Sequence, residues 1–304
     1  MTREELNQEK QQEIIAAERR ERRKKITILV FKILCAIVVG FTVFYLYTTY
    51  ISSGLLTIKE NRIIDKNLPN NFSGLKVIQI SDLHYGTTVF QTEVEELVRK
   101  INKRKPDLVI FTGDLVDKNY DINTSEQEEL INLLKKIKAT LGKYAVPGEE
   151  DDDLFYIIMK QSEFNVLEND YDLIYKDNMQ PIILIGLGTD VSSKSISNGF
   201  AYFNDPTHNS NIYTIVAGHD PDSIDAVLNS HEVNLYLAGH SHNGTIRLPI
   251  IGGIYKKDGA NKYIDEYYKV GKTKLYISSG LGTTEPGFRL FCRPSFNFFR
   301  ISTR

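Results

Sequence analysis

Two short motifs combine aspartate and histidine at a spacing that suits metal binding. Asp82 and His84 form a D-x-H motif, and His240 and His242 form an H-x-H motif. Residues two apart in extended backbone point the same way, so both members of each pair can reach one site. Carboxylate oxygens and neutral imidazole nitrogens are ligands for zinc, manganese and iron. These motifs therefore predict a site for divalent metal.

Three further turns place acids or a histidine beside a glycine. They are Gly113-Asp114 with Asp117, Gly148-Glu149-Glu150-Asp151, and Gly218-His219. Each of the five motifs follows a predicted strand, and ligands in open α/β sheets gather at the carboxyl ends of strands. We therefore expect the five turns to converge, and a carboxylate among them can bridge two ions about 3.5 to 4 Å apart.

The elements that must position these turns alternate between strands and helices. Amphipathic helices are predicted at 92–104 and 126–139, where apolar residues recur at helical spacing. Strands are predicted at 75–80, 108–111, 144–146, 182–185, 212–216, 235–238, 275–277 and 296–301. This alternation predicts an α/β architecture with parallel strands at the front.

Taken in order, the five blocks resemble the calcineurin-like metallophosphoesterases, whose pattern is D-x-H, G-D-x-x-[DN], G-N-H-[DE], a later His, and G-H-x-H. The resemblance covers roughly residues 55–304, and residues 238–249 and 279–283 are similar to the membrane-associated bacterial branch. It implies a two-sheet β-sandwich flanked by helices, the αββα metallophosphoesterase fold. It also implies a binuclear centre of two divalent metal ions, such as Mn, Zn or Fe.

The resemblance also implies a role for each matching residue. The first metal would be held by Asp82, His84 and His242, Asp114 would bridge, and the second metal would be held by His219 and His240. A hydroxide between the metals would attack phosphorus. The implied function is a metal-dependent phosphoester hydrolase, either a phosphodiesterase or a phosphomonoesterase.

The third motif departs from the family pattern. Glu149 stands where the family has a metal-binding Asn, and a carboxylate can also ligate, so Glu149 is a predicted metal ligand. Glu150 stands where the family has its catalytic His, and with a raised pKa it would act as a general acid. An ionised Glu150 would instead repel a phosphate by about 4 kcal/mol at about 4 Å and an effective dielectric of about 20. Two functions therefore stay open: a working hydrolase, and a catalytically impaired metal-binding pseudoenzyme that acts as a binding or regulatory module.

Simpler interpretations exist for several of these residues. Asp114 and Asp117 also fit helix caps. The acidic run at 149–153 also fits the start of a helix at 154–161, because acids favour a helix N-terminus.

The first 51 residues predict a charged tail and a membrane anchor. Residues 1–25 end in a basic cluster, and residues 26–51 are apolar apart from Lys32. The uncharged stretch at 33–51 has about the length that spans a bilayer. A single anchor helix is favoured over a cleaved signal or a buried core helix. The basic excess before it predicts a cytoplasmic N-terminus and an extracytoplasmic domain at 52–304, attached to the cell membrane.

Composition limits the partners. The net charge of -2 and a pI near 6.3 do not indicate nucleic-acid binding. Cys35 lies in the apolar run, so no disulfide with Cys292 is expected. The predicted substrate is a phosphate ester, and the anchor suggests a lipid-linked or envelope-derived one. The aromatic-rich stretch at 288–299 predicts core strands, with a membrane-facing patch as the alternative.

Overall fold

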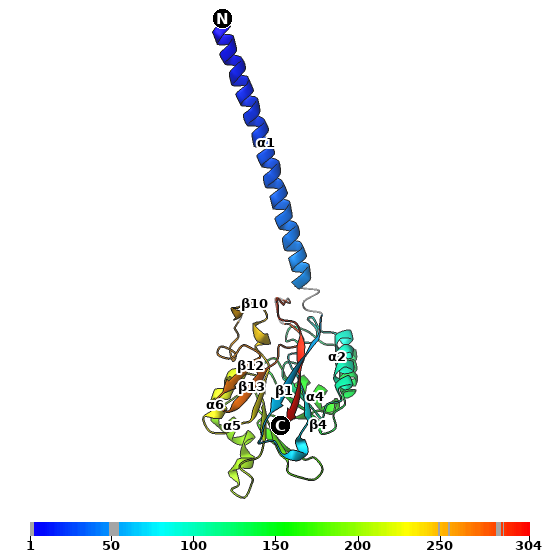
Figure 1. Ribbon diagram of the computed structural model, residues 1–304. Coiled ribbons are helices and arrows are strands. Elements are labelled where there is room, and N and C mark those ends of the chain that lie inside the picture. The colour runs from blue at the N-terminus through cyan, green and yellow to red at the C-terminus, as the bar shows by residue number, and fades with distance from the viewer. Residues whose placement is uncertain (1–2, 49–54, 249, 255, 284–286, 288) are drawn as a thin grey trace. The chain divides into compact units, whose positions relative to one another are not determined.

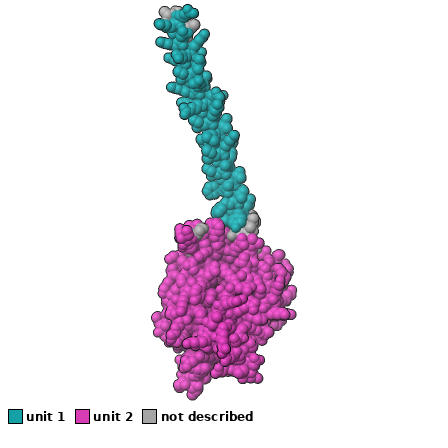
Figure 2. Space-filling model, viewed as in Figure 1, with its two compact units in different colours: residues 1–48 teal, residues 49–304 magenta. Residues whose placement is uncertain are grey.

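The computed structural model of the chain describes residues 3–48, 55–248, 250–254, 256–283, 287 and 289–304. The chain forms two compact units, residues 1–48 and residues 49–304, which Figure 2 distinguishes by colour. The predicted boundary between the anchor and the domain, at residues 51 and 52, falls outside the described residues.

The first unit is one long helix, α1 (Arg3–Leu46), so the charged residues from Arg3 to Lys25 are helical as well. Its segment Lys10–Leu46 is long and apolar enough to cross a membrane, with a mean hydropathy of 2.6 in its most apolar window. Large apolar side chains such as Phe31 and Phe41 are exposed along it. A membrane span and an N-terminal signal sequence both have these properties.

The first sheet of the second unit has six strands in the order β1-β14-β2-β3-β4-β5. Their bounds are β1 (Thr57–Ile64), β2 (Leu75–Ile80), β3 (Leu108–Thr112), β4 (Gly142–Val146), β5 (Asn165–Val166) and β14 (Ser295–Ser302). Strands β2 to β5 are parallel. Strand β14 is antiparallel to β2 and parallel to β1. The strands from the N-terminal part of the domain, β2 to β5, are therefore parallel, as predicted. The last strand of the chain, β14, lies between the first two, β1 and β2.

The second sheet also has six strands, in the order β12-β13-β9-β8-β7-β6. Their bounds are β6 (Asp170–Ile174), β7 (Ile182–Gly186), β8 (Thr214–Ala217), β9 (Leu235–Ala238), β12 (Tyr267–Val270) and β13 (Thr273–Ile277). Strands β7, β8, β9 and β13 are parallel to one another, and the two outer strands are antiparallel to their neighbours. A separate hairpin pairs β10 (Arg247–Leu248) with β11 (Gly252–Gly253).

Helices cover the outer face of each sheet (Figure 1). The first sheet packs against α2 (Gln91–Arg104), α3 (Thr124–Lys135) and α4 (Asp153–Gln161). The second packs against α5 (Ser193–Gly199) and α6 (Ile224–Leu228). Short 3-10 turns are η2 (Asn70–Phe72), η3 (Ala201–Asn204), η4 (Pro221–Ser223) and η5 (His242–Gly244).

The core confirms the predicted layers. Alternate residues of one strand point to opposite faces of its sheet. Val77 of β2 therefore packs between the two sheets, and Ile78 packs under the helices. The predicted α/β sandwich of two sheets flanked by helices is confirmed.

Two local expectations are refined by the structure. The helix predicted at 126–139 begins earlier, at Thr124, because the side chain of Asn123 caps it, and it ends at Lys135, with Lys136 as its C-cap. In the aromatic-rich stretch, Phe296, Phe298 and Phe299 are buried in β14, which fits core strands. Phe291 is instead exposed, and Phe288 lies outside the described residues.

Candidate metal centre

The predicted ligands lie where parallel strands end at one edge of the sandwich. Asp82 and His84 follow β2, and Asp114 follows β3 in the first sheet. His219 follows β8, while His240 and His242 follow β9 in the second sheet. All six side chains are buried. They form two groups of three, each with ligand atoms within 4.8 Å of one another: Asp82, His84 and His242, and Asp114, His219 and His240.

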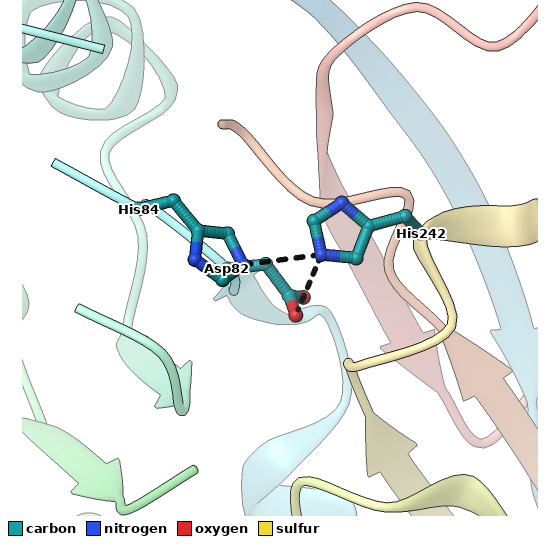
Figure 3. Close-up of side chains that lie close together, drawn as sticks. All are labelled: Asp82, His84 and His242. Carbon is teal, nitrogen blue, oxygen red and sulfur yellow. Dashed lines mark hydrogen bonds and ion pairs between the residues drawn. The ribbon is translucent and has the colours of Figure 1, made fainter. Parts of the chain in front are cut away.

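The first group is shown in Figure 3, where three side chains point toward one another. Nε2 of His242 lies 3.3 Å from Oδ1 of Asp82 and 3.2 Å from Nε2 of His84. Oδ1 of Asp82 also accepts a hydrogen bond from the backbone N–H of His240, at 2.9 Å. These contacts fix the orientation of the Asp82 carboxylate and leave its Oδ2 free.

Asp114 joins the first group to the second. Its Oδ2 lies 3.1 Å from Nε2 of His219 and 3.6 Å from Nε2 of His84. A carboxylate oxygen at this point is within reach of a cation held by either group. The family resemblance implies a bridging carboxylate at this residue.

Two histidines have their ring protons fixed by backbone carbonyls. Nδ1 of His219 lies 2.7 Å from the carbonyl oxygen of Thr112, and Nε2 of His240 contacts the carbonyl oxygen of Asp258. A carbonyl only accepts, so these ring nitrogens carry the protons. The opposite nitrogens, Nε2 of His219 and Nδ1 of His240, then face the site and are the atoms that a cation would bind. Metal-binding histidines in proteins usually have this arrangement.

The backbone is strained at five of these residues. Left-handed φ angles between 42° and 64° occur at Asp82, His84, Asp114, His240 and His242. Such angles are uncommon outside glycine, and they cluster at functional sites where the surrounding structure maintains them. The shared conformation turns each side chain sharply away from its strand and into the site.

Two glycines allow the ligand turns to approach one another. A Cβ atom on Gly148 would collide with Oδ1 of Asp114, and one on Gly239 would collide with Oγ of Ser81 and crowd Oδ2 of Asp82. Any larger residue at either position would therefore displace a carboxylate of the site.

The unpaired polar atoms of the site fit bound cations. Buried side-chain atoms without a hydrogen-bond partner gather here: Oδ2 of Asp82, Nδ1 of His84, Oδ2 of Asp114, Nε2 of His219, Nδ1 of His240 and Oδ1 of Asp220. Buried polar groups are nearly always hydrogen-bonded, so each exception requires an explanation. Divalent metal ions explain the oxygen and imidazole donors that converge here, whereas Nδ1 of His84 faces the carboxylate of Glu150 at 3.3 Å.

The charges of the site are strongly coupled. Burial opposes ionisation of Asp82 and Asp114, but the neighbouring histidines outweigh it and hold the pKa of both carboxyls well below the usual value. Burial likewise disfavours a charged His219, yet Asp114 raises the pKa of that imidazole well above its usual value. Burial lowers the pKa of His242 to about 3, so this ring is neutral. Asp82 and Asp114 are thus anionic at neutral pH.

The two unusual glutamates lie at the rim. Oε1 of Glu149 is 3.4 Å from Nδ1 of His240, and its side chain is half exposed. Oε2 of Glu150 is 3.3 Å from Nδ1 of His84, and its side chain is almost buried. Burial raises the pKa of Glu150, but His84 outweighs burial and leaves that pKa below its usual value. Of the two states left open for Glu150, this contact favours the ionised one.

Sequence reasoning missed two residues that face the ligands. Oδ1 of Asp220 is buried, unpaired and 3.9 Å from Nδ1 of His240, so Asp220 is a further candidate ligand. Arg289 is fully buried, and its Nη2 lies 3.3 Å from Nδ1 of His242. Each had a signal in the sequence: Asp220 directly follows His219, and Arg289 is a charged residue between the apolar residues Phe288 and Leu290.

The three acids that follow Glu150 have different roles. Asp152 caps α4 and Asp153 is its first residue, as the simpler interpretation held. Asp151 instead accepts three hydrogen bonds of 2.8 Å, from the backbone N–H groups of Asp114, Leu115 and Gly148. Its carboxylate therefore ties the third motif to the second. Burial and the nearby Asp114 raise the pKa of Asp151 to about 7.

An Asp151→Asn variant is expected to unfold more easily, because an amide has one acceptor oxygen where three N–H groups need partners. Leaving a buried N–H unsatisfied destabilises a protein by about 1–3 kcal/mol. Chemical denaturation of metal-free protein measures this loss. Asp153→Asn, at an exposed position two residues away, is the control. Equal stability of the two variants would contradict the role given to Asp151.

The comparisons with known proteins agree with this geometry. A family model described as calcineurin-like phosphoesterase matches residues 75–244. The chain is 28% identical over 265 residues to the uncharacterized metallophosphoesterase YkuE of Bacillus subtilis, covering 85% of this chain and 90% of YkuE. It is 26% identical over 236 residues to the phosphodiesterase YaeI of Escherichia coli, covering 76% of this chain and 84% of YaeI. It is also 26% identical over 257 residues to the uncharacterized metallophosphoesterase Cj0846 of Campylobacter jejuni, covering 82% of this chain and 64% of that protein.

The matched region contains the five predicted motifs from Asp82 to His242, and the strands that position them. Metallophosphoesterases from several bacteria are similar to most of the chain. The chain belongs to the calcineurin-like phosphoesterase family and is a metallophosphoesterase that acts on ester bonds.

Proposed function

We propose that the chain is a membrane-anchored phosphodiesterase whose turnover depends on two divalent cations. The observation that carries this proposal is the convergence of two buried donor groups, each with unpaired ligand atoms, around Asp114. Asp82, His84 and His242 would hold one cation, and His219, His240 and Glu149 the other. When bound, such cations supply a nucleophile at neutral pH and neutralise charge that develops on the phosphoryl group.

The acidic rim favours a diester over a monoester. Glu149 and Glu150 place two carboxylates beside the donor groups. Repulsion grows with the charge of the substrate, and a monoester carries close to two negative charges where a diester carries one. The name of the relative YaeI, a phosphodiesterase, points in the same direction.

Glu150 is assigned as a positioning residue for His84. Its carboxylate lies on the Nδ1 side of the ring, opposite the nitrogen that faces Asp114. A carboxylate at this place orients the imidazole and raises its basicity as a ligand. With a lowered pKa, Glu150 holds no proton to donate at neutral pH. Glu150 therefore assists the reaction through His84.

Anchoring rests on α1. Its apolar segment follows a basic cluster that runs from Arg19 to Lys25, which favours a cytoplasmic N-terminus and an extracytoplasmic domain. The substrate would then be a phosphodiester of the cell envelope or its lipids.

The test is to purify the full chain in detergent, measure bound metal, and assay a chromogenic phosphodiester. We expect two metals per chain and turnover that an Asp82→Ala variant abolishes. Metal binding without turnover would favour the pseudoenzyme, and a chain that binds no metal would refute the site.

A further inference from the structure

A cluster of large apolar side chains is exposed beside the metal centre. It comprises the β10–β11 hairpin with its flank and one residue of a neighbouring segment: Leu248, Ile250, Ile251, Ile254 and Phe291. We name this set the apolar hairpin patch. Ile250 is fully exposed, Ile251 is 72% exposed and Phe291 is 63% exposed. Grouped apolar exposure of this kind marks a protein or membrane interaction site.

Two of the exposed apolar residues have a strained backbone conformation. Ile250 has a φ of 75° and Phe291 a φ of 53°. A β-branched or bulky residue with positive φ is a genuine outlier, and such outliers persist where the surrounding structure enforces them. The fold therefore holds two large apolar side chains outward at strained positions.

The patch is built onto the metal centre. Arg247 of β10 donates from Nη1 to the carbonyl oxygen of Asn243, at 2.9 Å, next to His242. On the other flank, the carbonyl oxygen of Asp258 contacts Nε2 of His240. The segment that carries Phe291 is joined to the hairpin by the bridge between Ile246 and Leu290. A surface or molecule that binds the patch therefore lies next to the predicted metal-binding residues.

The strand register shows that the first strand of the domain, β1, begins at the edge of the sandwich that carries the ligands. Asn297 of β14 pairs with Gln79 of β2 in antiparallel fashion, so β14 begins where β2 ends, at the ligands. Thr57 pairs with Ser295 in parallel fashion, and its N–H donates to the carbonyl oxygen of Pro294. Strand β1 therefore also begins at the edge that holds the metal centre.

Chain length then limits where a membrane can lie. Six residues separate Thr48 of the first unit from Leu55, and an extended chain of that length spans at most about 25 Å. If α1 crosses a bilayer, the edge with the patch is tethered close to that bilayer.

Basic side chains flank the patch as well: Lys256 and Arg293 are exposed, and no ion pair is present for either among the described residues. Apolar side chains flanked by basic ones suit an interface with anionic lipid.

We propose that the apolar hairpin patch enters the interfacial region of the bilayer and holds the metal centre at the depth of the headgroups, so that the substrate is a lipid-linked phosphodiester. This inference rests on the proposed function and identifies its substrate class. The competing occupant of the patch is a second copy of the chain.

Fluorescence tests the proposal directly, because the chain contains no tryptophan. Ile251→Trp places a single probe in the patch. Met179→Trp is the matched control, since Met179 is 59% exposed and precedes β7 at the opposite end of the parallel strands. Both full-length variants are reconstituted into vesicles of anionic lipid, with and without bromine atoms on the upper acyl carbons. Thermal melting of each variant checks that the domain is folded.

We expect bromine to quench most of the Ile251→Trp emission, with a shift to shorter wavelength, and to leave the Met179→Trp emission unchanged. Equal quenching of both probes, or a blue shift that depends on protein concentration and not on bromine, would overturn the proposal; the latter would indicate a second copy. Co-flotation of the control with vesicles reports the anchor separately. None of these readouts depends on hydrolysis, so a failed phosphodiesterase assay and a failed membrane contact are distinguished.

Discussion

An Asp114→Asn variant is expected to lose about 10²–10³-fold in kcat toward a phosphodiester, the loss that follows removal of one preorganised electrostatic group from an active site. The substitution preserves shape but removes the negative charge between the two donor groups, 3.1 Å from His219 and 3.6 Å from His84. Without that charge two cations cannot be held close together. The measurements are kcat at saturating substrate and metal content by elemental analysis, which should fall in parallel.

The matched control is Asp177→Asn. Asp177 also adopts a left-handed φ, of 56°, but it is exposed in the turn between β6 and β7. The control should retain the metal content and kcat of the parent. If Asp114→Asn kept two metals and full turnover, Asp114 would have no bridging role and the arrangement proposed for the centre would be wrong.

Glu150→Gln is expected to weaken metal binding about 10–100-fold, the usual effect of losing a carboxylate that orients a metal-binding histidine. The reason is the 3.3 Å contact between its Oε2 and Nδ1 of His84. Excess metal should therefore restore kcat. The KM for an anionic diester should also fall, because an ionised carboxylate beside the site has been removed. Titration of metal-free protein followed by kinetics at saturating metal measures both effects.

Whether excess metal restores the kcat of Glu150→Gln distinguishes two roles for Glu150: positioning of His84 and proton transfer. A general acid at Glu150 would leave kcat low at every metal concentration and would change the pH profile of the reaction. Glu232→Gln, an exposed glutamate paired only with Lys272 among the described residues, controls for the change in net charge. If kcat stayed low at saturating metal, Glu150 would instead be the general acid that its position in the third motif first suggested.

Buried strands were predictable from sequence because most of their residues are apolar. The bounds of β2 and β9 agree with the sequence prediction: β9 is apolar throughout, and four of the six residues of β2 are apolar. Strand β1 was not predicted. Its residues Lys59, Glu60 and Arg62 are polar, and it is an edge strand that pairs only with β14. A strand of this kind depends on a partner more than 230 residues away in sequence, which no local pattern reveals.

The same distinction holds for the centre. The motif spacing brought Asp82, His84 and the H-x-H pair to attention because each motif is local. Arg289 acts on His242 from 47 residues away, and its three backbone or ring contacts exist only once the chain has folded. Glu150 was identified by position, but its ionisation is set by His84, a neighbour only in space. Sequence therefore identified the donors, and the structure was needed for the groups that orient them.

The place of β14 in the first sheet has a consequence for biogenesis. Strand β14 is inserted between β1 and β2, so β1 lacks its neighbour, and β2 lacks one of its two neighbours, until residues 295–302 have left the ribosome. Contacts this distant in sequence form slowly, because a long loop must close before they contribute stability. During synthesis, the nascent polypeptide would therefore expose unpaired edges of β1 and β2, the kind of surface that chaperones protect from aggregation.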